Sequence, residues 1–509
     1  MNYKITLLSA LLCSTLGFAQ TEFLNTEFGN NGAACIDVPG ETFIMGDIIK
    51  VDNTFYGLTS FTNHALIKLS ETGQIDPSFG TNGYVQLDLT SAAGAIYDNT
   101  NAFIKTTPNN NLLMVANTGY LPEHNFMVMT DLNGNPIASF GNNGYVNLDW
   151  PDYLNILMAE IINNEIFLVF RNDSTNENNP QQYLYITKYD LNGNIISAFG
   201  DDGVIVFNID INTYTKSALY APETGKLTVL IDQYTEENFS SHIVQYDLDE
   251  AAIDTDFGTD GYIYYNTVNN ISTLPNVLYS DNNSIYLAGT TGISGPNQTL
   301  FVTKLNLNGQ PDTSFGNNGT FLYNDELAGY SIWAINKTGG YLTLTGTDQY
   351  TNPGSDKIFV MRITENGQLD TSFGIDGLIT NPNDLSVLTA TYRTLIEEDH
   401  ITIATNSYAC STDGQPKPAV LQFIAGSSLT TTQVTKSTLD FYPNPVKDIL
   451  YITGEAITKA EVYDISGKLL YTVTNPEANQ INLSTLQSGL YLLKIVNTKG
   501  AANIKVVKE

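Results

Sequence analysis

Residues Asp312-Thr-Ser-Phe-Gly-Asn-Asn-Gly319 end in a Phe-Gly-x-x-Gly motif that occurs seven times in the 509-residue chain. The phenylalanines of the seven copies are Phe28, Phe79, Phe140, Phe199, Phe257, Phe315 and Phe373. Successive copies lie 51, 61, 59, 58, 58 and 58 residues apart. A regular period of this length is typical of repeat architectures, in which each unit buries its apolar faces against its neighbours.

One repeat contains four short apolar runs separated by turn-forming residues, at 274–279, 284–289, 300–305 and 320–323. Four such strands form an antiparallel sheet that cannot bury its own faces. Radial packing of the sheets solves this problem and leaves only short edges. The chain is therefore predicted to be all-β, with a seven-bladed β-propeller over residues 20–425.

The motif lies at the turn between the third and fourth strands of each predicted blade. Its glycines permit positive φ or close backbone approach, and its phenylalanine is expected to fill the gap between blades. In four copies an aspartate three residues before the phenylalanine is placed to bond turn amides; these are Asp76, Asp254, Asp312 and Asp370. A set of metal sites is the alternative role, but Ile137 and Ile196 replace the aspartate in two copies.

The motif resembles the delta-60 repeat family, whose pattern is DGKhhhhG…RhxxxGxxDxSFGxxG. The match is strong at Pro77-Ser-Phe-Gly-Thr-Asn-Gly83 and weaker at the DGK turn, which reads Lys337-Thr-Gly-Gly340 in one repeat. The resemblance covers about residues 21–425. It implies a propeller-like fold and carries no activity that could be transferred to this chain.

The ends of the repeat region predict how the ring closes. No strand precedes the first motif copy, while three runs at 390–396, 401–406 and 419–424 follow the last copy. Residues 33–38 are expected to supply the fourth strand of that last blade, which hides an exposed edge. Cys35 on this strand and Cys410 in the same blade could form a disulfide that locks the seam; two buried free thiols are the alternative.

Loop variability predicts where a ligand binds. The loops between second and third strands share one face with the connections between blades, and on this face they differ from repeat to repeat. Function in repeat scaffolds resides in variable loops, although drift is the alternative. Aromatic candidates for binding sugar or peptide on this face are Tyr97, Tyr120, Tyr153, Tyr183, Tyr234, Tyr350 and Tyr408. His64, His124 and His242 occupy similar repeat positions on three blades, too widely spread for one metal site.

Composition excludes several classes of partner. The formal net charge is -31, so nucleic acid and anionic lipid are repelled. Lys4 followed by a mostly apolar run and Gly17-Phe-Ala19 predicts a signal peptide over residues 1–19. No other long apolar segment is present, and membrane insertion is not expected.

Residues 426–437 are rich in Ser and Thr and are predicted to be a linker. Residues 438–509 are predicted to form a small β-sandwich. They contain Phe441-Tyr-Pro-Asn-Pro-Val446, Val462-Tyr-Asp-Ile-Ser-Gly-Lys468, Leu486-Gln-Ser-Gly-Leu-Tyr491 and Lys505-Val-Val-Lys508. These blocks resemble the type A C-terminal sorting domain of type IX secretion. The resemblance implies that the sorting signal includes Pro443, Asn444, Pro445, Gly467, Gly489, Tyr491, Lys505 and Lys508.

The functional expectation is a secreted or cell-surface binding or scaffolding module for glycan or protein, which crosses the periplasm and meets the type IX secretion machinery. A monomer is expected. The alternative is an extracellular polysaccharide- or peptide-processing enzyme acting at the same variable face, and a structural surface protein is a third reading. No catalytic motif is found, no cofactor is predicted, and calcium binding is left open.

Overall fold

The computed structural model describes residues 23–36, 43–61, 64–87, 102–117, 125–148, 154–172, 182–209, 213–234, 239–265, 267–268, 271–281, 283–291, 298–324, 330–348, 357–380, 387–410, 416–425, 441–453, 457–464, 469–474, 476–497 and 500–509. The chain divides into two compact units, Met1–Gly426 and Ser427–Glu509. Within the described residues there is no α-helix. The predicted signal peptide and linker lie outside the described residues.

The described strands of the first unit form seven antiparallel sheets, and in six of them the strands follow chain order. The first three sheets consist of β2 (Phe43–Val51), β3 (Thr54–Phe61), β4 (Ala65–Ser70) and β5 (Tyr84–Gln86); β6 (Ala102–Thr106), β7 (Leu112–Asn117), β8 (Asn125–Thr130) and β9 (Tyr145–Asn147); and β10 (Leu154–Ile162), β11 (Glu165–Asn172), β12 (Gln182–Asp190) and β13 (Val204–Ile209).

The next three sheets have the same plan, with short extra strands in two of them. They consist of β14 (Thr213–Ala221), β15 (Lys226–Tyr234), β16 (Phe239–Asp247), β17 (Ala252–Ile253) and β18 (Tyr262–Tyr265); β19 (Thr267–Val268), β20 (Ile271–Asp281), β21 (Ser284–Thr291), β22 (Thr299–Asn306) and β23 (Thr320–Asn324); and β24 (Tyr330–Thr338), β25 (Tyr341–Asp348), β26 (Lys357–Thr364) and β27 (Leu378–Thr380).

The seventh sheet joins the two ends of the propeller sequence. It pairs β28 (Val387–Ile396), β29 (His400–Ser407) and β30 (Lys417–Ile424) with β1 (Ala33–Cys35), in the order β1-β30-β29-β28. Ala33 lies opposite Leu421 in the register, as the fourth strand of the last sheet. Cys35 and Cys410, which lies in a short 3-10 segment (Tyr408–Cys410), are joined by a disulfide with Cα atoms 5.4 Å apart.

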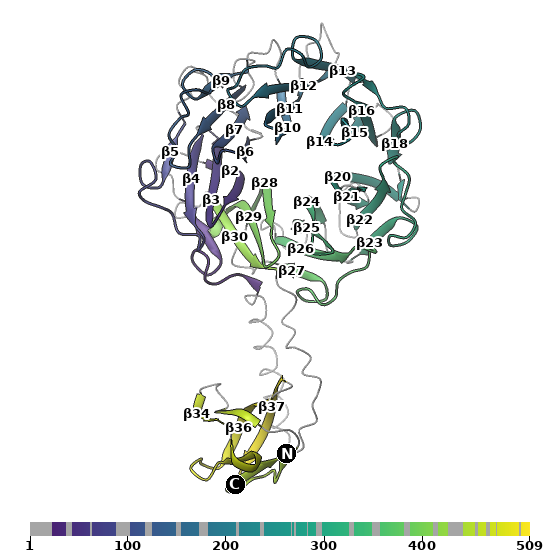
Figure 1. Ribbon diagram of the computed structural model, residues 1–509. Helices are drawn as coiled ribbons and strands as arrows, with labels where there is room; N and C mark the ends of the chain where they lie inside the picture. Colours follow the sequence, from purple (N-terminus) through teal and green to yellow (C-terminus); the bar gives the residue numbers. More distant parts are fainter. Residues whose placement is uncertain are drawn as a thin grey trace, which may run out of the picture. The chain divides into compact units, whose positions relative to one another are not determined.

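The seven sheets pack side by side around a ring, with the first strand of each nearest the centre (Figure 1). Strand β28 of the last sheet packs against β2 of the first sheet. At this seam the Asn406 Oδ1 accepts a hydrogen bond from the Met45 amide at 3.2 Å, and Lys50 Nζ lies 2.8 Å from Glu397 Oε1. The fold is therefore the all-β propeller that the repeat predicted.

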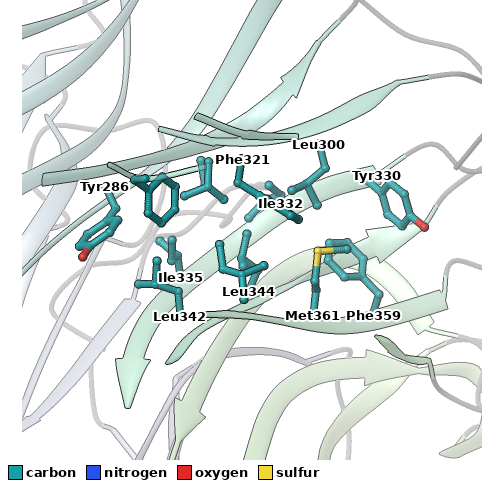
Figure 2. Close-up of a cluster of buried hydrophobic side chains, with 14 residues drawn as sticks. Tyr286, Leu300, Phe321, Tyr330, Ile332, Ile335, Leu342, Leu344, Phe359 and Met361 are labelled. Atoms are coloured by element: carbon teal, nitrogen blue, oxygen red, sulfur yellow. The ribbon is translucent and has the colours of Figure 1, made fainter. Parts of the chain in front are cut away.

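Each motif phenylalanine lies in a hydrophobic cluster between two neighbouring sheets. Phe315, which is fully buried, belongs to the cluster between the fifth and sixth sheets. In Figure 2, Tyr286 and Phe321 of the fifth sheet face Ile332, Leu342 and other apolar side chains of the sixth. The predicted role of the phenylalanine as an inter-blade filler is confirmed.

The motif backbone also reaches the neighbouring sheet. Gly316 N donates to Asn366 O of the next repeat at 2.8 Å, and the equivalent bond from Gly29 N to Thr72 O is 2.7 Å long. Gly316 has a φ of +55°, and a Cβ there would lie 2.4 Å from Thr320 O. The residue before the last motif glycine also has positive φ in all seven copies and is always Asn or Asp, both of which tolerate this conformation.

The motif aspartates close the turn that precedes the phenylalanine, as predicted. Asp312 Oδ1 accepts hydrogen bonds from Ser314 N at 3.1 Å and Ser314 Oγ at 2.6 Å, while its Oδ2 lies 2.8 Å from Lys304 Nζ. The hydrogen bonds from Lys304 and then Ser314 lower the pKa of Asp312 to about 2. The carboxylate is thus already engaged with a cation.

The second unit is a small β-sandwich, as predicted. One sheet consists of β31 (Phe441–Tyr442), β32 (Ile449–Ile452) and β35 (Gln480–Asn482), and the other of β33 (Ile457–Tyr463), β34 (Leu469–Thr474), β36 (Gly489–Asn497) and β37 (Gly500–Lys508). A short 3-10 segment spans Glu477–Asn479. Leu450, Ile481, Val462 and Leu493, two from each sheet, are fully buried in the shared core.

Removing a motif side chain should loosen one contact between sheets. We expect Phe315→Ala to lower the free energy of unfolding by about 3–5 kcal/mol, because it leaves a cavity between two sheets. Guanidinium unfolding of the secreted chain measures this loss. Phe199→Ala is the matched control, since Phe199 is only partly buried and should cost less. Equal losses at the two positions would contradict the inter-sheet role.

Breaking the disulfide should weaken ring closure. A disulfide between residues 375 positions apart restricts the unfolded chain strongly. We expect the Cys35→Ser, Cys410→Ser double variant to be less stable by roughly 2–5 kcal/mol. Thermal unfolding with and without a reducing agent measures this. The reducing agent should lower the unfolding temperature of the wild type to that of the double variant and leave the unfolding temperature of the variant unchanged. An unfolding temperature of the wild type that does not change on reduction would contradict the prediction.

Acid should remove the contribution of the motif aspartates. A carboxyl whose pKa is lowered on folding stabilises the native state above its unfolded pKa of about 4, and this stability is lost as the pH falls toward 2. We expect Asp312→Asn to cost roughly 1 kcal/mol at pH 7 after solvent screening and to flatten the loss between pH 4 and pH 2. Urea unfolding across this range tests it, with exposed Glu71→Gln as the control; identical slopes for wild type and Asp312→Asn would refute it.

Candidate binding face

The two ends of the propeller strands differ in their chemistry. At one end, here called the motif face, lie the Phe-Gly-x-x-Gly turns and the hairpins between first and second strands. At the other end, here called the loop face, second strands end, third strands begin and each blade connects to the next. The loop face is the predicted ligand face, so the candidate binding residues are those that the structure describes on it.

Buried polar side chains gather at the loop-face ends of the second and third strands. They are Thr59, His64, Asn125, Arg171, Asn172, Asp232, Ser241, His242, Thr291, Thr347, Asp348, Asn406 and Ser407. Several of them cap strand ends. Asn172 Oδ1 accepts from Tyr183 N at 2.6 Å, and Thr291 Oγ1 accepts from Thr299 N at 3.1 Å. Asn172 and Thr291 thus each bond the start of the following strand across the loop.

The three predicted tyrosines that the structure describes lie on three different sheets of this face. Tyr183 begins a strand of the third sheet, Tyr234 ends a strand of the fourth, and Tyr408 follows a strand of the seventh and is 38% exposed. Three sheets thus carry one each, and they do not form a common site. Tyr97, Tyr120, Tyr153 and Tyr350 lie outside the described residues.

The predicted histidines occupy separate, buried positions. His64 on the first sheet packs against Phe126 with ring centroids 5.3 Å apart, and His242 on the fourth packs against Tyr264 at 5.5 Å. His124 falls outside the described residues. In the part of the chain that the structure describes, no group of three or more His, Cys, Asp or Glu side chains is arranged to hold a metal ion.

A repeated β-bulge marks the inner strands near the loop face. The register shifts by one residue between Met45 and Asp47, Ile156 and Met158, Thr215 and Ser217, Pro275 and Val277, and Ile332 and Ala334. The extra residues at these five positions are Gly46, Leu157, Lys216, Asn276 and Trp333. Bulges re-aim side chains and are frequent beside functional sites.

Three of the bulged residues, on consecutive sheets, carry polar or aromatic side chains. Lys216 Nζ lies 2.6 Å from Asp232 Oδ2 and donates to Pro275 O at 3.1 Å and to Asn276 Oδ1 at 3.2 Å. Asp232 is fully buried and also accepts from Ser241 Oγ at 2.5 Å. The Lys216 charge is therefore neutralised, and the ammonium fixes the orientation of the neighbouring amide.

Trp333, on the next inner strand, is 37% exposed. Its indole Nε1 donates to Thr347 Oγ1 at 3.1 Å, which fixes the plane of the ring. Lys216, Asn276 and Trp333 are not among the residues predicted from the sequence. The sequence of one strand does not reveal the bulge, because the register shift exists only in the pairing of the first strand with the second. A comparison of inner-strand lengths among repeats is the one signal that could have suggested it.

The residues of the predicted sorting signal take part in the fold of the second unit. Asn444 Nδ2 donates to Lys505 O at 3.2 Å and Asn444 Oδ1 accepts from Val507 N at 2.8 Å, so the Pro443-Asn-Pro445 segment is tied to the last strand. Tyr491 Oη donates to Gln487 O at 2.9 Å. Lys505 is exposed, Lys508 is 8% exposed, and Gly489 begins β36. Gly467 lies outside the described residues.

Comparison with protein families finds one match in each unit. Residues 440–509 match the family described as a secretion system C-terminal sorting domain, and residues 281–315 match the family described as a domain of unknown function forming a β-propeller. Comparison with curated protein sequences finds no match. Within the described residues, no helix has the length and apolar character needed to cross a membrane.

Similar solved structures include the polysaccharide lyase Uly1, at 11% identity and a TM-score of 0.44 over 77% of this chain and 94% of that chain. Prolyl oligopeptidase B from Galerina marginata is 10% identical with a TM-score of 0.42, over 89% of this chain and 55% of that one. A subtype N10 neuraminidase-like protein of A/little yellow-shouldered bat/Guatemala/060/2010 is 9% identical with a TM-score of 0.35, over 64% of this chain and 93% of that chain. The chain combines a β-propeller with a type IX secretion sorting domain at its C-terminal end.

Proposed function

We propose that the chain is an exported, non-catalytic binding module that presents its loop face to glycan or protein outside the cell. The sorting-domain match over residues 440–509 carries the export half of this proposal. That domain engages the type IX secretion machinery, and the cargo, having crossed the periplasm, is released or attached to the cell surface.

The contrast between the two ends of the propeller supports the binding half. Every repeat needs the same contacts at the motif face, and all seven copies keep the same Phe-Gly-x-x-Gly turn there. No residue type is repeated in this way at the bulged positions of the loop face, which hold residues as different as Gly46, Lys216 and Trp333. A rigid ring with one varied end is suited to recognition.

Deleting residues 438–509 tests export. In the native secreting cell the shortened chain should accumulate in the periplasm, because the sorting domain that engages the translocon has been removed. Cell fractionation with detection of the propeller measures its location. The full chain carrying Tyr264→Ala is the control, since it alters an exposed propeller residue and leaves the sorting domain intact. A shortened chain that reaches the surface or medium as the full chain does would contradict the proposal.

Thermal unfolding of the secreted chain tests binding and the open question of calcium. A ligand present at 100 times its Kd should add about 2.7 kcal/mol to the free energy of unfolding. The panel comprises soluble polysaccharides, extracted surface proteins, calcium and a chelator. We expect stabilisation by a polysaccharide or a protein fraction without cleavage of it. Cleavage of a stabilising polymer would show that the chain is an enzyme and would contradict the non-catalytic role. The absence of any stabilisation would contradict binding and favour a structural role.

A further inference from the structure

The five bulged positions that the described inner strands show fall into two chemically different sets. The same one-residue bulge recurs in five inner strands, so packing alone does not require different chemistry at each of these positions. Gly46 and Leu157 occupy it on the first and third sheets. Lys216, Asn276 and Trp333 occupy it on the fourth, fifth and sixth sheets, which are neighbours in the ring (Figure 1).

Resting on the proposed binding function, the geometry points to Asn276 and Trp333 as the centre of a binding site for an uncharged polysaccharide. The Trp333 indole, which is 37% exposed, offers a flat apolar surface that complements the C–H face of a sugar ring. The Asn276 amide, at the equivalent bulge position of the neighbouring inner strand, provides donors for sugar hydroxyls. A few oriented polar groups beside an aromatic surface are the usual composition of a small-ligand site.

The polar partner is held in one orientation before any ligand arrives. Lys216 Nζ can only donate, so the Asn276 atom that lies 3.2 Å from it is the oxygen. The amide nitrogen is the remaining polar atom, and among the described residues no partner is recorded for it. Asp232 and Ser241 behind Lys216 keep the ammonium in place. Such preorganisation lowers the cost of ordering the site on binding.

Charge selects the class of polysaccharide. The chain carries a net charge of -31, which repels carboxylated and sulfated polymers. Lys216, the cation that the described residues bring to Asn276, is 2.6 Å from a fully buried carboxylate, and its charge is already paired. Hydroxyl recognition by an amide and stacking on an indole both operate without ligand charge, so a neutral polymer fits the site.

Titration of the full chain with dextran, soluble starch, xyloglucan and galactomannan tests the site, with alginate and heparin as charged comparisons. At least one uncharged polymer should bind, and the charged polymers should not. Trp333→Ala should weaken binding at least tenfold, whereas Trp333→Phe keeps a ring face and should lose less than threefold. Asn276→Asp replaces the side-chain NH2 group, a hydrogen-bond donor, by an oxygen that only accepts, in a side chain of nearly the same size and shape. This variant should also bind at least tenfold more weakly.

Tyr264→Ala is the matched control, because Tyr264 is an exposed aromatic residue, 62% accessible, on an outer strand. It should bind as wild type does, and the circular dichroism of every variant should match wild type. If an uncharged polymer binds all variants equally, the site lies elsewhere and only this inference fails. If only charged polymers or only proteins bind, the ligand class is wrong while the binding function stands. If nothing binds, both fail.

Discussion

The contact on which the propeller depends is the motif phenylalanine buried between two sheets. A four-stranded sheet has two apolar faces and no core of its own, so each sheet is stable only against its neighbours. Phe315 is fully buried in one such gap, while the amide of Gly316 donates to the next repeat at 2.8 Å. Side-chain burial and a backbone hydrogen bond thus join the same two repeats at the same turn, and Gly29, Gly141 and Gly258 make the equivalent bond.

A ring built in this way must also close. The closing sheet takes its outer strand from residues Ala33–Cys35 and its other three strands from the far end of the propeller sequence. Because β28 packs on β2 and Cys35 is bonded to Cys410, the last sheet is held by hydrogen bonds, apolar packing and a covalent link. Because the contacts that hold the ring lie at the motif face and the seam, the residue type at the loop face can vary from repeat to repeat, as it does at the bulge positions.

Much of the fold could be predicted from sequence because its determinants are local and repeated. The motif spacing indicated the propeller, and the motif aspartates bond turn amides as their position suggested. The site could not be predicted equally well. The bulge at Lys216, Asn276 and Trp333 is a relation between paired strands, and the Lys216–Asp232 pair joins residues whose proximity depends on register. Tyr183, Tyr234 and Tyr408 do lie at the loop face, but the sequence could not show that they stand on separate sheets.

The central claim is that one end of the propeller maintains the ring and the other end binds. Hydrogen exchange of the full chain, read by mass spectrometry with and without a saturating soluble uncharged polysaccharide, tests it most directly. We expect slower exchange in peptides that cover Lys216, Asn276 and Trp333 and unchanged exchange in the seven motif turns. Protection confined to the motif turns, with the loop-face ends of the inner strands unaffected, would contradict the account.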